Sequence, residues 1–166
     1  FGIGFGQMAA VAHLTGFSLE DAATALAIVT AAGIGASDAG TSLKTMFLNL
    51  NPQTKAARKL MAELGIITKD GRNQFFDAAG SVRSLADVSQ VLNDALKDMT
   101  DEDRILALKK LFGQDAVRAA AILYGQAADG VNLFKAAIED ADAAEQGKKR
   151  LDNLLGSLEK MKGSIE

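Results

Sequence analysis

Few residues of this chain have side chains suited to covalent or metal chemistry. His13 is the single histidine among the 166 residues, and the sequence contains no cysteine. A histidine-based catalytic triad, a histidine-rich metal site and thiol catalysis are therefore excluded. The lack of cysteine also excludes disulfides, which fits a reducing compartment. We expect a packing or surface role for His13, and we expect no catalytic residue, no metal site and no cofactor.

Carboxylates gather at two places where paired acids or a cation site might be sought. Asp98 precedes the acidic run 101–103, which stands at an expected helix start, where the helix dipole favours negative charge. No oxygen-rich loop with a central glycine follows, as calcium binding would require. The second group, Asp140, Asp142 and Glu145, is surrounded by alanines, which is typical of a solvated helical face. Both groups indicate surface charge.

Two further segments are superficially similar to phosphate-binding motifs. Residues 2–6 read Gly-Ile-Gly-Phe-Gly, but no strand pattern precedes them and no Lys-Ser/Thr pair follows. Residues 148–150 form the one basic cluster, next to Glu145 and Asp152, which is ordinary decoration of a helical exterior. With 18 basic and 21 acidic residues intermixed and a net charge of −3, the chain has no basic face typical of nucleic-acid binding. We expect no specific nucleic-acid partner.

The segment 33–52 contains the densest set of helix signals in the chain. Gly33 and Gly35 favour the end of one helix, Ser37 is suited to capping the next, and Asn51 with Pro52 is expected to open a third. We expect Gly33, Gly40 and Pro52 to form corners. Between them, residues at intervals of three and four predict one core-facing stripe, formed by Ala39, Leu43, Met46, Phe47 and Leu50.

Helix signals recur along the remaining sequence. Ser18 with Asp21, Ser84, and Thr100 with Asp103 predict helix starts. Helix ends are predicted at Gly65 and Gly113, and a corner at Gly125 and Gly130. Asp115 is expected to open the short helix before that corner.

The segment 66–76 differs in character from the helical regions. Asp70-Gly71 between β-prone flanks is typical of a tight turn, so we predict a small β-hairpin here. Because an isolated ribbon is marginal in water, Ile66, Phe75 or Phe76 is expected to lean on the helices.

The C-terminal segment has a strict apolar repeat. A heptad seam typical of coiled coils is formed by Leu151, Leu154, Leu158, Met161 and Ile165. We expect these residues to join copies of the chain to one another.

These patterns together predict an all-α protein. Hydrophobic residues make up 48% and aromatic residues 5%, and only one proline is present, which favours closely packed helices. We expect a compact helical bundle over residues 1–140 and the start of a long heptad-patterned helix over residues 141–166. The first residue is Phe and the helical pattern is unfinished at Glu166, so we expect a piece of a longer polypeptide.

The order of these pieces resembles the tail tape measure protein family of long-tailed phages and prophages. The resemblance spans roughly residues 15–166, and its pieces are Ala32-Gly33-Ile34, Ala39-Gly40-Thr41-Ser42-Leu43 with Met46, Leu50 and Pro52, Leu64-Gly65-Ile66, Asp70 and Gly71, Leu111-Phe112-Gly113 with Ala116, and Asp152-Asn153-Leu154 with Gly156, Leu158 and Lys162.

What this resemblance implies is a structural and assembly role. A tape measure segment would contribute to tail-length determination and tail tube assembly, with the tail tube and tail assembly proteins as partners. It would be assembled in the bacterial host cytoplasm and end in the interior of the virion tail. No catalytic activity is expected.

Two other classes of function stay open at this point. A membrane-interacting module that assists genome entry would use residues 1–14 and 22–36, although no apolar run reaches the roughly 20 residues that span a bilayer. A cell-wall hydrolase is the other class, but no catalytic constellation supports it. A bundle role is the better interpretation of the small residues in 22–36.

Overall fold

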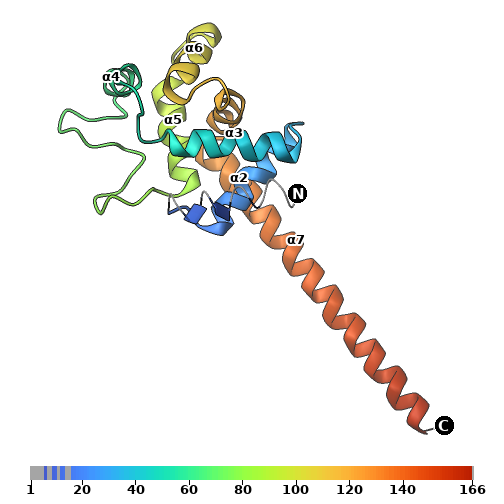
Figure 1. Ribbon diagram of the computed structural model, residues 1–166. Coiled ribbons are helices and arrows are strands. Elements are labelled where there is room, and N and C mark those ends of the chain that lie inside the picture. Colours follow the sequence, from blue (N-terminus) through green and yellow to red (C-terminus); the bar gives the residue numbers. More distant parts are fainter. Residues whose placement is uncertain (1–5, 7–8, 11, 14–15, 166) are drawn as a thin grey trace. The chain divides into compact units, whose positions relative to one another are not determined.

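The protein is a chain of helices, with one long connection between α4 and α5 (Figure 1). The computed structural model describes residue 6, residues 9–10, 12–13 and 16–165, and the side chains among these up to residue 141. The named helices are α2 (Leu19–Ala31), α3 (Ala36–Leu48), α4 (Lys55–Glu63), α5 (Leu85–Leu96), α6 (Asp101–Phe112) and α7 (Val117–Ile165). The predicted all-α class is confirmed.

Two compact units make up the chain, residues Phe1–Phe134 and Lys135–Glu166. Within the first unit, α2 packs on α3 and α5, and α4 packs on α6. The second unit is helical through Ile165. The boundary between residues 140 and 141 stays a prediction.

Three of the predicted helix starts are confirmed. The hydroxyl of Ser18 accepts a hydrogen bond from the N–H of Asp21 at 3.0 Å. Ser84 does the same for Asp87 at 3.2 Å, and Thr100 for Asp103 at 3.2 Å. Each hydroxyl satisfies a donor that the first helical turn leaves without a partner.

Two other predicted helix starts are wrong. Gly35, not Ser37, is the N-cap of α3, and no side chain caps this helix. Ser37 lies one residue inside the first turn. Likewise Pro52 does not open α4, because Thr54 caps that helix by accepting from the N–H of Ala57 at 3.0 Å. Because the hydroxyl of Thr54 caps the helix, α4 begins at Lys55.

Glycines with positive φ follow three helices. Gly33, Gly65 and Gly113 have φ of +100°, +80° and +91° after α2, α4 and α6. A residue with a Cβ is strained in this region, so glycine favours the helix end there. Gly40 is different: it is buried inside α3 and forms no corner.

The segment 66–83 reverses direction twice without forming named strands. An antiparallel bridge joins Ile67 to Asn73 around the predicted turn at Asp70-Gly71, and a second joins Phe76 to Val82. The predicted hairpin therefore takes the form of an isolated bridge. Phe75 anchors the segment in the core, with its ring centroid 6.4 Å from that of Phe112.

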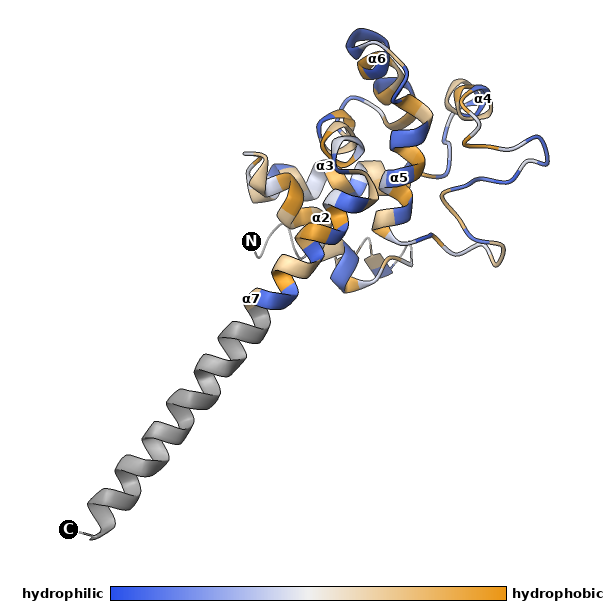
Figure 2. Ribbon diagram, turned by 180° about the vertical axis from the view of Figure 1, so that it is seen from behind, coloured by the Kyte–Doolittle hydropathy of each residue, from blue (hydrophilic) through white to orange (hydrophobic). Residues whose placement is uncertain are grey.

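Apolar residues of α2, α3 and α5 supply much of the core of the first unit. α2 is orange along much of its length in Figure 2 and buries Ala22, Leu26, Ile28 and Val29. Packing in the core stabilises such a helix, because its apolar surface would otherwise face water.

One helix, α7, contains a break. Ala127 has φ 53° and ψ −164°, whereas the helix is continuous to either side. The break lies between Gly125 and Gly130, where the sequence predicts a corner. The helix before the break begins at Val117, two residues after Asp115.

Candidate functional site

The predicted stripe on α3 is part of the core. Leu43 and Met46 are fully buried and Phe47 is 2% exposed. The ring of Phe47 lies 4.4 Å from that of Phe17, centroid to centroid. Burial of this kind stabilises the unit by removing apolar surface from water. The stripe holds α3 in place and presents no reactive group.

Polar side chains of the first unit bind the ends of other helices. The carboxylate of Asp21 in α2 accepts a hydrogen bond from the N–H of Leu85 at the start of α5, at 3.2 Å. The hydroxyl of Ser42 in α3 accepts from the N–H of Ala119 near the start of α7, at 3.3 Å. The sequence predicted only the contacts that each helix makes within itself, because capping motifs are local patterns.

A third such contact joins the ends of two helices. The side-chain amide of Asn49, the C-cap of α3, donates to the carbonyl oxygen of Phe112, the last residue of α6, at 2.6 Å. That carbonyl is one of those that a helix end leaves without a partner. Helix ends, which normally rely on water, are thus fixed to neighbouring helices.

The acidic run at the start of α6 is part of the helix terminus. Asp101, Glu102 and Asp103 lie in its first turn. Arg104 pairs with Asp101 at 2.8 Å and donates to the carbonyl oxygen of Met99 at 2.9 Å. Its guanidinium also lies 4.7 Å from the centre of the Tyr124 ring. Arg104 thus binds the corner between α5 and α6 through its hydrogen bond to Met99.

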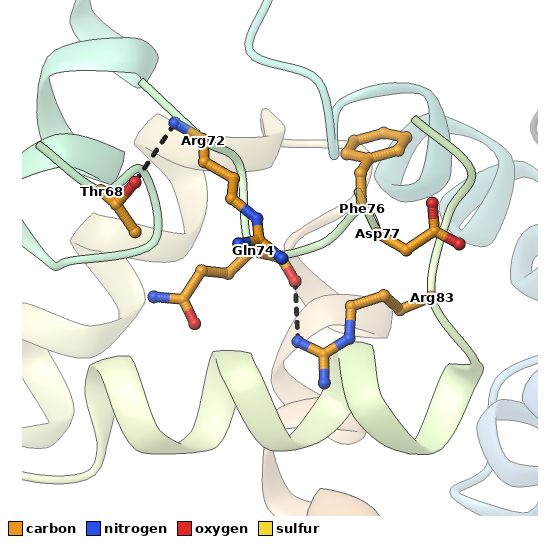
Figure 3. A pocket seen from close by; sticks show the side chains of 6 residues that line it. All are labelled: Thr68, Arg72, Gln74, Phe76, Asp77 and Arg83. Atoms are coloured by element: carbon orange, nitrogen blue, oxygen red, sulfur yellow. Dashed lines mark hydrogen bonds between the residues drawn. The ribbon is translucent and has the colours of Figure 1, made fainter. Parts of the chain in front are cut away.

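An open pocket of about 510 Å³ lies beside the segment 66–83. Figure 3 shows its lining, which includes Arg72 and Arg83. Arg83 donates to the carbonyl oxygen of Gln74 at 3.1 Å, and the carboxylate of Asp77 accepts from the N–H groups of Ala79 and Ser81. These polar groups hold the loop itself, and no nucleophile stands beside a base here.

The described part of the chain has neither a metal-binding cluster nor a membrane-spanning helix. It contains no group of three or more histidine, cysteine, aspartate or glutamate residues placed to hold a metal ion. None of its helices has both the length and the apolar character needed to cross a membrane. Of the two segments proposed for a membrane role, residues 22–36 contribute buried residues of α2, and residues 1–14 lie mostly outside the described residues.

The predicted self-association seam lies in the second unit. Its backbone is helical, since α7 runs to Ile165. The side chains of the seam lie outside the described residues, and these are Leu151, Leu154, Leu158, Met161 and Ile165. The seam stays a prediction.

Comparison with known proteins gives two matches. A family model described as phage-related minor tail protein matches residues 1–113. A protein named tape measure protein, from Pneumococcus phage Dp-1, is 32% identical over 161 residues, which are 96% of this chain and 13% of that protein. The chain thus spans about an eighth of the length of this relative. No solved structure matches the chain.

Proposed function

Because this chain belongs to the family of phage-related minor tail proteins, we propose that it is a segment of a tape measure polypeptide that contributes to tail-length determination and tail tube assembly. Family membership gives it a structural role in the phage tail. The likeness to a relative that is named tape measure protein carries the finer proposal. Assembly would take place in the cytoplasm of the bacterial host, with tail tube and tail assembly proteins as partners.

Helical geometry supplies the physical basis of a ruler. A continuous α-helix adds about 1.5 Å for each residue, so its length is proportional to the number of residues. The second unit is helical from Lys135 through Ile165. A segment of this kind can contribute a fixed increment of length to a longer helical polypeptide.

An insertion series tests the ruler. One, two or three extra copies of residues 142–162 would be inserted after residue 162 in the parent gene of the phage, which keeps the seven-residue repeat in phase. Each 21-residue copy should lengthen the tail by about 32 Å, measured as the mean over many virions by electron microscopy. A control with Asn153→Glu keeps the length of the chain and should keep that of the tail. Tails of constant length across the series would contradict the proposal.

The heptad seam is proposed to join copies of the chain. Leu154→Glu places a charge in the seam, whereas Asn153→Glu places the same charge one residue away, on the expected outer face. Light scattering over a concentration series should show that the parent chain and Asn153→Glu associate and that Leu154→Glu does not. A parent chain that stays monomeric at every concentration would refute this part of the proposal.

We also propose that the segment acts without catalysis. Its described polar groups bind helix ends and loops, as Asp21, Ser42 and Asp77 do. The purified chain should release no soluble fragments from peptidoglycan. Release that a single Asp→Asn or Glu→Gln substitution abolishes would show that the segment is a hydrolase.

A further inference from the structure

The break in α7 lies at a residue type that disfavours its conformation. Ala127 has φ 53° and ψ −164°, a region of backbone space that is essentially restricted to glycine. Alanine is also the residue with the highest helix propensity. Interactions with residues outside α7 are therefore needed to stabilise the non-helical backbone of Ala127.

Two side chains of α5 bind the backbone groups that the break separates. In a continuous α-helix the N–H of Ala128 would donate to the carbonyl oxygen of Tyr124, four residues earlier. Here the N–H of Ala128 donates to Oε1 of Gln90 at 3.2 Å, and the carbonyl oxygen of Tyr124 accepts from Nδ2 of Asn93 at 3.1 Å. One donor and one acceptor on α5 thus replace both halves of a single helical hydrogen bond.

The apolar pattern of α7 is compatible with a helix that has no break. Residues on one stripe recur at intervals of three and four straight through the break, with no shift in period. The stripe comprises Ala120, Leu123, Ala127, Val131 and Phe134. Ala120, Leu123 and Val131 are buried. The two glycines predict a corner here, but the apolar spacing of α7 also allows a continuous helix as the alternative state.

Gly130 accommodates the broken form. A Cβ at this position would overlap the side chain of Gln126, whose own Cβ would be 2.9 Å away. The contact involves the base of the Gln126 side chain as well as its flexible end, so it cannot be relieved by rotating the amide alone. A residue larger than glycine disfavours the broken form and, by its higher helix propensity, favours the continuous one.

We propose that α7 has two backbone states at residues 124–128, and that Gln90 and Asn93 of α5 select between them. With α5 in place, the two side chains stabilise the break. When α5 is no longer packed against α7, the N–H of Ala128 donates to the carbonyl oxygen of Tyr124 and α7 becomes continuous. The packing of one helix thereby controls whether its neighbour is broken or straight, whatever the role of the chain in the tail.

The backbone state of Ala127 can be read directly from its ¹³Cα and ¹³Cβ chemical shifts, measured on the whole 166-residue chain. The parent chain should show non-helical shifts at Ala127. The double variant Gln90→Ala/Asn93→Ala should show helical shifts there, while Ala121, on the exposed face of α7, stays helical in both. Helical shifts at Ala127 in the parent chain, or non-helical shifts in the folded double variant, would overturn the proposal.

Two substitutions in α7, with Ala121→Gly as their control, test the same states without altering α5. Ala127→Gly relieves the backbone in the broken form and should raise the folding equilibrium constant by about tenfold. Ala121→Gly, at a helical position, should lower it. Gly130→Ala should shift Ala127 toward helical chemical shifts. The two-state proposal is wrong if Ala127→Gly lowers stability as Ala121→Gly does, or if Gly130→Ala leaves the chemical shifts of Ala127 unchanged. These two outcomes can be measured even if the double variant fails to fold.

Discussion

The carboxylate of Asp21 in α2 accepts a hydrogen bond from the backbone N–H of Leu85, the first residue of α5, across 64 positions of sequence. Asp21 is only 7% exposed and Leu85 is fully buried. The N–H groups of a first helical turn have no partner within the helix, and the helix dipole makes that end favourable for a negative charge. A single side chain therefore fixes the start of α5 against α2.

We expect Asp21→Ala to lower the free energy of unfolding by about 2 kcal/mol, because it leaves a buried N–H without an acceptor. Asp21→Asn should lower the free energy of unfolding by less, since the amide oxygen of asparagine can still accept the hydrogen bond from Leu85. Asp38→Ala is the matched control, because Asp38 is an exposed residue in the first turn of α3. Urea denaturation followed by circular dichroism measures all three. Equal losses for Asp21→Ala and Asp38→Ala would show that the contact with α5 contributes nothing.

Ser42 and Ser37 allow the same substitution to be compared within one helix. Ser42 is 2% exposed and accepts from the N–H of Ala119, whereas Ser37 is exposed in the first turn of α3. Ser42→Ala should cost about 1 kcal/mol, the usual loss when a capping hydroxyl is removed. Ser37→Ala should change stability by less than about 0.5 kcal/mol. A larger loss at Ser37 would mean that it caps α3 in solution.

The helices of this protein are easier to predict from sequence than the contacts between them. Ser18, Ser84 and Thr100 could be identified because each caps its own helix three residues away. The long-range acceptors Asp21 and Ser42 could not, since their partners lie 64 and 77 residues away and no local pattern encodes them. The pattern of Ser18 with Asp21 predicts only a helix start, which is the local interpretation of the same residue.

The misplaced helix starts have a related cause. Several residues with capping propensity stand near each start, and propensity favours Ser37 over Gly35 and Asn51 over Thr54, the reverse of what the structure has. Gly35 precedes Ser37 by two residues, and Thr54 follows Asn51 by three, so a shift of two or three residues changes which one caps. Local patterns identify that a helix is present more reliably than they identify its first residue.

Leu43 tests whether the stripe of α3 is core. Its side chain is fully buried, whereas Leu48, five residues later in the same helix, is 42% exposed. Leu43→Ala should lower the free energy of unfolding by about 2 to 5 kcal/mol through lost burial and a cavity. Leu48→Ala should stay within about 0.5 kcal/mol of the parent chain. If Leu43→Ala leaves stability unchanged but abolishes tail assembly in the phage, the stripe is an interface instead of core.

Ser89 should respond to alanine with the opposite sign from Ser42. Both serines are buried, but the hydroxyl of Ser89 has no hydrogen-bond partner among the described residues, whereas that of Ser42 accepts from Ala119. Burying an unpaired hydroxyl costs about 1 to 3 kcal/mol, and alanine also has the higher helix propensity within α5. Ser89→Ala should therefore raise the midpoint of urea denaturation while Ser42→Ala lowers it. The chemical change is the same at both sites, so the sign of each effect reports on the hydrogen bonding of that hydroxyl. A loss of stability at both sites would show that Ser89 has a partner in solution. A gain at both sites would show that the hydrogen bond between Ser42 and Ala119 does not form.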